Sequence, residues 1–196
     1  MRMIKWLLLL FAIGSVSAQR YEVLSGSLEV LGNINEYNVT FSYDGMKIHG
    51  YDSEEAFLKE KVEKRQKSPE KAEAFAENWY AFRESKYEPR FIDYFNGRFE
   101  NAEVKMGKNP SAKYTLNVKT TWLYPGYGIG MGGEEAKVSA ILTVFETANP
   151  SKVLLSLEFD KSIGLANKNY NDFGDRISGA YEKLAKNLVM QVKRFK

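Results

Sequence analysis

The chain has 196 residues, of which 44% are hydrophobic and 27% are charged, and its formal net charge is +3. It contains no cysteine and one histidine, which excludes a disulfide framework, an iron–sulfur cluster, a cysteine nucleophile and any site built from several imidazoles. We therefore expect one folded domain of ordinary size, without a metal ion or another cofactor.

Residues 1–18 have the pattern of a secretory signal peptide. Basic residues at the start precede the apolar run Trp6–Ile13, and small residues lead up to Ala18. The apolar run is too short for a helix that spans a bilayer, which needs about 20 residues. We expect cleavage near Ala18, a single mature domain over residues 19–196 with no transmembrane segment, and a periplasmic or secreted location. Without the leader the chain is close to neutral, so we expect no nucleic-acid partner.

The first segments of the mature chain predict short strands. Residues 21–31 suggest an extended segment that breaks at Gly26. Apolar and polar residues alternate over Tyr37–Tyr43, which is typical of a half-buried strand. After a turn at Asp44-Gly45, residues 46–50 can form a short edge strand.

Helical patterns follow. Asp52 with Glu55 three positions later matches a capping box, and we expect a helix from there to about Lys67. Ser68 and Pro69 begin a second helix, which we expect to end at Pro89, and residues 91–99 form a third short helical or irregular segment. The second helix has an apolar stripe that we assign to the core, including Phe75, Trp79 and Phe82.

The second half of the chain predicts most of the sheet. Alternating patterns indicate strands over 113–124, 137–147 and 152–160, and the last two are joined by a turn at Ala148–Ser151. An apolar stripe then predicts a helix over Asp175–Phe195. The expected fold is α+β, with a mixed, mainly antiparallel sheet of about five strands packed against helices that include this long C-terminal amphipathic helix.

The most unusual segment is Tyr124–Gly133, where five of ten residues are glycine. It is followed by a strand rather than a helix and lacks the Lys-Ser/Thr pair of a phosphate-binding loop, so it does not predict nucleotide binding. Two interpretations stay open: a mobile connection between strands, and a loop that binds a partner. Apolar side chains in and beside the loop favour the second, and we take as candidate partner-binding residues Trp122, Tyr124, Tyr127, Ile129 and Met131.

Charged residues are dense over 59–67. Glu60 precedes Lys64 by four positions, and Glu63 precedes Lys67 likewise, an order that favours salt bridges along a helix. We therefore interpret this run as a solvated, self-paired helical face rather than an anion-binding patch.

No catalytic constellation stands out. We interpret His49, beside a turn, as a surface residue rather than a general base. Asp160, Asp172 and Asp175 lie near one another in sequence, but no spacing requires two of them to share a face, as the paired carboxylates of a glycosidase must.

Several stretches resemble a group of uncharacterised secreted proteins from Bacteroides-like bacteria, a group that supplies no function to transfer. The matching stretches are Phe41-Ser42-Tyr43 through Ser53-Glu54-Glu55, Thr120–Gly126, Glu146–Val153 and Gly179-Ala180-Tyr181. The expected architecture is also similar to periplasmic accessory domains of the curli-secretion and penicillin-binding-protein-activator type. That resemblance implies an assembly or accessory role in the envelope, although this chain lacks the lipobox cysteine of those lipoproteins.

These observations favour an exported, non-enzymatic envelope accessory protein that binds a protein or glycan partner. The alternative is a hydrolase that acts through carboxylates on an envelope polymer. The two differ in what a single substitution should do, because a hydrolase loses nearly all function with one carboxylate and a binding surface loses it gradually.

Overall fold

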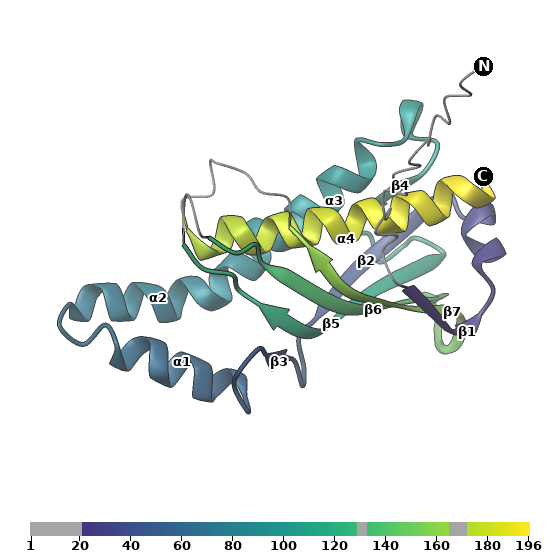
Figure 1. The fold of residues 1–196 in the computed structure, drawn as a ribbon. Coiled ribbons are helices and arrows are strands. Elements are labelled where there is room, and N and C mark those ends of the chain that lie inside the picture. Colours follow the sequence, from purple (N-terminus) through teal and green to yellow (C-terminus); the bar gives the residue numbers. More distant parts are fainter. Residues whose placement is uncertain (1–20, 129–132, 165–171) are drawn as a thin grey trace, which may run out of the picture.

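The computed structural model describes residues 21–128, 133–164 and 172–196, so the expected signal peptide lies outside the described residues. The fold is α+β, as expected, and is built on a mixed sheet of seven strands in the order β1-β7-β6-β5-β2-β4, with β3 paired to β5 (Figure 1). The strand count is therefore somewhat higher than the expected five. The strands are β1 (Tyr21–Gly26), β2 (Glu36–Ser42), β3 (Lys47–Ile48), β4 (Lys105–Gly107), β5 (Tyr114–Tyr124), β6 (Lys137–Glu146) and β7 (Asn149–Ile163).

Helices α3 and α4 lie against the sheet, whereas α1 and α2 form a hairpin that extends beyond the sheet near β3 (Figure 1). None of the helices that the structure describes is long and apolar enough to cross a membrane. The helices are α1 (Glu54–Glu63), α2 (Pro69–Phe82), a π-helical turn (Arg83–Tyr87), α3 (Glu88–Asn96) and α4 (Phe173–Phe195), with 3-10 turns at Leu28–Asn33 and Glu100–Ala102.

The sheet is antiparallel on one side and parallel on the other. β5, β6, β7 and β1 pair antiparallel in that order, and β2 pairs parallel with both β5 and β4. Alternate side chains of β6 and β7 are buried, including Leu142 and Leu157, and the apolar stripe of α4 packs with them in one core. The period of two in the strands and of 3.6 in α4 thus places both apolar faces in the same layer.

Two predicted boundaries were wrong at turns. The β6–β7 turn is formed by Thr147 and Ala148, because Asn149 already pairs with Glu146 and begins β7. Pro150 therefore lies within β7, but outside the part of the strand that pairs with β1. One edge of β7 has no partner strand there, and proline, which lacks a backbone N–H, is tolerated at such an edge. Helix α1 is capped by Ser53, whose Oγ accepts from Ala56 N at 3.1 Å, rather than by Asp52, and it ends at Glu63.

The prediction that Pro89 ends the second helix was also wrong. The helical path continues from α2 through the π-helical turn into α3, where Pro89 lies in the first turn. The Glu88 amide bonds to the Arg83 carbonyl, five residues back, so the register changes just before the proline. At the start of a helical segment the missing N–H of proline costs little.

Candidate functional site

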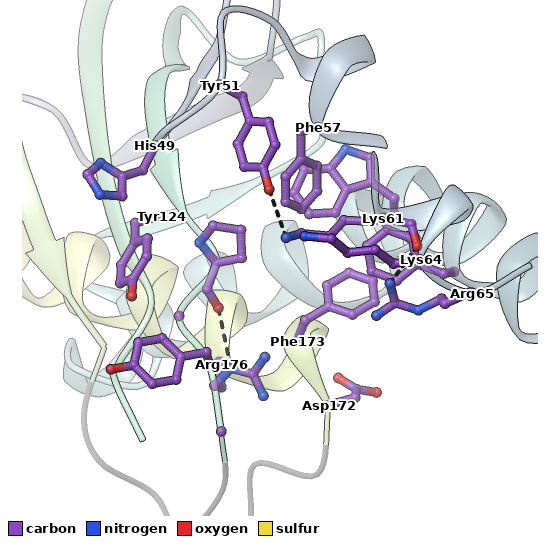
Figure 2. Close-up of a pocket in the computed structure, with 16 residues that line it drawn as sticks. His49, Tyr51, Phe57, Lys61, Lys64, Arg65, Tyr124, Asp172, Phe173 and Arg176 are labelled. Atoms are coloured by element: carbon purple, nitrogen blue, oxygen red, sulfur yellow. Dashed lines mark hydrogen bonds between the residues drawn. The ribbon is translucent and has the colours of Figure 1, made fainter. Parts of the chain in front are cut away.

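A cavity of about 640 Å³ lies between the α1–α2 hairpin on one side and the end of β5 with the start of α4 on the other (Figure 2). Its lining combines aromatic rings and cations. The aromatic residues are Tyr51, Phe57, Phe75, Trp79, Tyr124, Tyr127 and Phe173, and the cationic ones are Lys61, Lys64, Arg65 and Arg176.

The floor of the cavity is an aromatic cluster around Trp79, which is 2% exposed. The Trp79 ring centroid lies 4.6 Å from that of Phe57 and 5.7 Å from that of Phe173. Trp79 Nε1 donates to Glu54 Oε1 at 2.5 Å, and Arg83 also pairs with Glu54. Because the indole N–H has its partner outside the cavity, Trp79 contributes an apolar ring to the floor.

The wall formed by the end of α1 and the turn that follows it carries three cations that differ in their pairing. Glu60 accepts from Lys64 Nζ at 2.5 Å and from the Tyr51 hydroxyl at 2.7 Å, and these hydrogen bonds lower the pKa of Glu60 to about 2. Lys61 is 3.4 Å from the same carboxylate. Arg65 instead places its guanidinium 4.2 Å from the Phe75 ring centroid and donates to the Lys61 carbonyl at 2.7 Å.

The opposite wall is the end of β5 and the first part of the glycine-rich segment. Tyr127 and Glu134 exchange both backbone hydrogen bonds, at 3.1 and 2.9 Å, so this part of the segment continues the β5–β6 ladder. The Tyr124 hydroxyl donates to Glu134 Oε2 at 2.5 Å, and burial together with this hydrogen bond raises the pKa of Tyr124 to about 12. Tyr127 is 54% exposed and borders the opening.

The start of α4 contributes one cation and one carboxylate. Asp172 caps the helix by accepting from Asp175 N at 2.8 Å, and it also pairs with Lys86 at 2.8 Å. Arg176 Nε donates to the Pro125 carbonyl at 3.3 Å (Figure 2). Burial lowers the pKa of Arg176, because desolvation penalises its charged form, and an anionic ligand would replace the lost water.

Positive charge therefore exceeds negative charge in the lining. Within the described chain, neither Arg65 nor Arg176 forms an ion pair with a carboxylate within 4.0 Å. Asp172 is the one carboxylate among the described lining residues, and it is engaged with Lys86 and the helix terminus. This arrangement can bind an anion beside an apolar ring, but it lacks the two facing carboxylates that the hydrolase alternative needs. Among the described residues, no three or more His, Cys, Asp or Glu side chains form a group that could hold a metal ion.

The structure places the predicted partner-binding residues in three situations. Tyr124 and Tyr127 line the cavity. Trp122 lies outside the lining, with its ring 6.5 Å from that of Tyr124. Ile129 and Met131 lie outside the described residues.

Sequence analysis missed the residues that α1 and α2 contribute. The predicted Glu60–Lys64 pair forms, but Lys61, Lys64 and Arg65 line the cavity and do not form only a solvated face. Trp79 belongs to the core, as expected, and Phe75 packs against it, but both also line the cavity. One signal was available, because Phe57, Lys61 and Arg65 are spaced by four and would share one face of the helix predicted to about Lys67, although that helix ends at Glu63.

Comparisons with known proteins add little. No family model matches the sequence, and no curated protein matches it. Two solved structures of the PelC dodecamer from Paraburkholderia phytofirmans, one of them a variant, show a distant likeness, each with 13% sequence identity. The variant has a TM-score of 0.42 and covers 89% of this chain and 97% of that chain, and the other has a TM-score of 0.40 and covers 86% and 97%.

Proposed function

We propose that the protein is an exported envelope accessory protein that binds an acidic glycan in this cavity. The observation that carries the proposal is the aromatic floor lined by two arginines, Arg65 and Arg176, neither of which forms an ion pair within 4.0 Å in the described chain, although Asp172, Asp175 and Glu135 act on Arg176 at longer range. The expected signal peptide at residues 1–18 supports export.

The chemistry of the lining fits a sugar that carries a carboxylate. A pyranose ring presents C–H groups on its faces, and these can pack against the half-buried aromatic rings of the lining, Phe75 and Phe173. A uronate carboxylate accepts paired hydrogen bonds from a guanidinium, which arginine provides in a fixed planar geometry. The Arg65 guanidinium lies 4.2 Å from the Phe75 ring centroid, so the cation adjoins the aromatic cluster.

The size of the cavity favours a glycan over a folded protein partner. Its volume of about 640 Å³ falls within the range of about 300–1,000 Å³ that is usual for small-ligand sites. Stable protein interfaces bury about 1,600 Å² in total over a broader patch. We therefore assign the cavity to one or two sugar units.

Calorimetric titration with a galacturonic acid tetramer tests this function. We expect binding that weakens with added salt, and we expect the methyl-esterified tetramer, which has the same rings without the charges, to bind much more weakly. Equal affinity for the acid and the ester would contradict the role of the arginines. No binding of either compound would overturn the proposed function, and binding of an envelope protein instead would assign the surface to a protein partner.

Arg65→Gln and Arg176→Gln should each lower the affinity for the acidic tetramer by about tenfold, because each removes a charge-assisted contact worth about 1.5 kcal/mol. Lys186→Gln, on the exposed side of α4, is the control for a general change of charge. Thermal melts should show that the variants fold. If both arginine variants bind like the wild type, the cavity is not the site.

Export is tested by the mass of the protein recovered outside the cytoplasm. The mass should correspond to residues 19–196, which begin at Gln19. Recovery of a chain that still starts at Met1 would contradict the cleavage.

A further inference from the structure

A second aromatic surface adjoins the cavity on the sheet. Trp122 and Tyr124 lie two positions apart on β5, so their side chains emerge on the same face. Their ring centroids are 6.5 Å apart, and the ring planes are inclined by 27°. We call these two rings together with His49 the platform.

His49 fixes the arrangement of the two rings. Its backbone N–H donates to the Leu123 carbonyl at 2.9 Å, which attaches the residue after β3 to β5. Its imidazole meets Trp122 edge-on, with centroids 5.5 Å apart, and meets Tyr124 in the same way at 5.1 Å. His49 is exposed and both partners are half-buried, so the platform is preorganised at the surface.

A lysine ammonium lies over each of the two rings of the platform. Lys137 Nζ lies 5.1 Å from the Tyr124 ring centroid, and Lys161 Nζ lies 5.8 Å from that of Trp122. Lys161 adopts a left-handed backbone conformation, with φ of 47°, next to an irregularity in the β6–β7 pairing. The Lys161 amide donates to Ser139 Oγ at 3.0 Å, so the bend that positions this lysine is hydrogen-bonded. Its distance to Asp160 Oδ2 is 3.9 Å, which is a loose pair.

The platform and the cavity are continuous, because His49 and Tyr124 belong to both (Figure 2). Resting on the proposed function, we propose that the ligand is a segment of an acidic polysaccharide, with one unit in the cavity and the following units on the platform. The site therefore recognises a polymer rather than a monosaccharide.

Chain-length dependence tests the inference. Titration of the full mature protein with the mono-, di-, tri- and tetramer of galacturonic acid should show affinity that rises about tenfold from the shortest oligomer that binds to the tetramer. Trp122→Ala should abolish this rise and leave the affinity for the shortest binder unchanged, whereas Trp122→Phe should retain part of the rise. Tyr80→Ala removes a ring that is 48% exposed outside both surfaces, and it should leave every affinity unchanged.

The outcomes separate the inference from the function on which it rests. Equal wild-type affinity for all lengths, or an equal loss at every length in Trp122→Ala, would overturn the platform while the cavity remained a binding site. Absence of binding at every length would overturn the cavity as well. A length dependence that disappears only in the Trp122 variant supports the inference.

Discussion

The cationic side chains of the cavity fall into two groups: those that pair with a carboxylate and those that donate to backbone carbonyls. Lys61 and Lys64 share Glu60, whereas Arg65 and Arg176 use their N–H groups on backbone carbonyls that carry no net charge. Backbone contacts orient a guanidinium without cancelling its charge. The two arginines therefore form no close ion pair, although Asp172, Asp175 and Glu135 act on Arg176 at longer range, whereas the two lysines share Glu60.

Glu60 gives this arrangement a pH dependence. Hydrogen bonds from Lys64 and Tyr51 lower its pKa from 4.5 to about 2. Because the folded-state pKa is depressed, the contribution to stability is present above about pH 4.5 and is lost as the pH falls towards 2. Denaturant unfolding at neutral and acid pH should show a smaller acid loss for Glu60→Gln than for the wild type. Glu63→Gln, on the exposed side of α1, is the control, and an equal acid loss in both variants would contradict the role of Glu60.

Gly126 determines where the glycine-rich segment can turn beside the cavity. Its φ is +68°, and a Cβ at this position would lie 2.4 Å from the Glu134 carbonyl oxygen. Gly45 has a similar φ of +72°, and a Cβ there would have nothing within 4 Å. A substitution at Gly45 therefore measures the cost of the backbone conformation without a steric clash. Gly45→Ala should lower the free energy of unfolding by about 1–2 kcal/mol, and Gly126→Ala should lower it by more because the β5–β6 ladder must also shift. Thermal or denaturant unfolding of the two variants measures the difference. An equal loss of unfolding free energy in both would mean that the backbone near Glu134 moves away from the added Cβ at little cost.

Among the elements, α4 connects the core to the cavity. Its apolar stripe packs on β6 and β7, and its first turn supplies Phe173 and Arg176 to the lining. Stability and site geometry are therefore coupled through one helix. Substitutions that loosen the stripe should also disturb binding.

Leu184 tests the buried stripe of α4. The side chain is 0% exposed, and truncating such a leucine costs about 2–5 kcal/mol through lost contacts and the cavity left behind. Leu184→Ala should clearly lower the unfolding midpoint, while Lys186→Ala, at an exposed position of the same helix, should barely change it. Similar small effects in both variants would show that the stripe is not the main contact of α4 with the sheet.

The sequence predicted elements whose periodicity is local. Strands β5 and β6 and helix α4 were located within a few residues, because each buries one face along its whole length. The π-helical turn before Pro89 was missed, because a change of hydrogen-bonding register has no composition of its own. The cavity was missed for a different reason: its floor comes from α1, α2 and α4, and only tertiary packing brings Phe57, Trp79 and Phe173 together.

At the scale of the whole molecule, the cavity joins two parts of the structure. The α1–α2 hairpin extends away from the sheet (Figure 1), and it contacts the rest through β3, the π-helical turn and the start of α4. The lining residues on α1 and those on β5 belong to opposite sides of this junction. A ligand that contacts both sides would therefore oppose any opening of the hairpin.

Hydrogen exchange with and without the galacturonic acid tetramer measures how strongly the ligand opposes opening of the α1–α2 hairpin. Local opening of the hairpin destroys the site, so amides of α1 should exchange about 100-fold more slowly when the ligand is present at about 100 times its dissociation constant. Amides of the edge strand β1 exchange by fraying that leaves the site intact, and their rates should not change. Arg65→Gln at the same ligand concentration should show about tenfold less protection of α1, because the affinity falls by that factor. Unchanged α1 exchange in a complex shown to form by calorimetry would mean that the ligand contacts only the sheet side of the cavity.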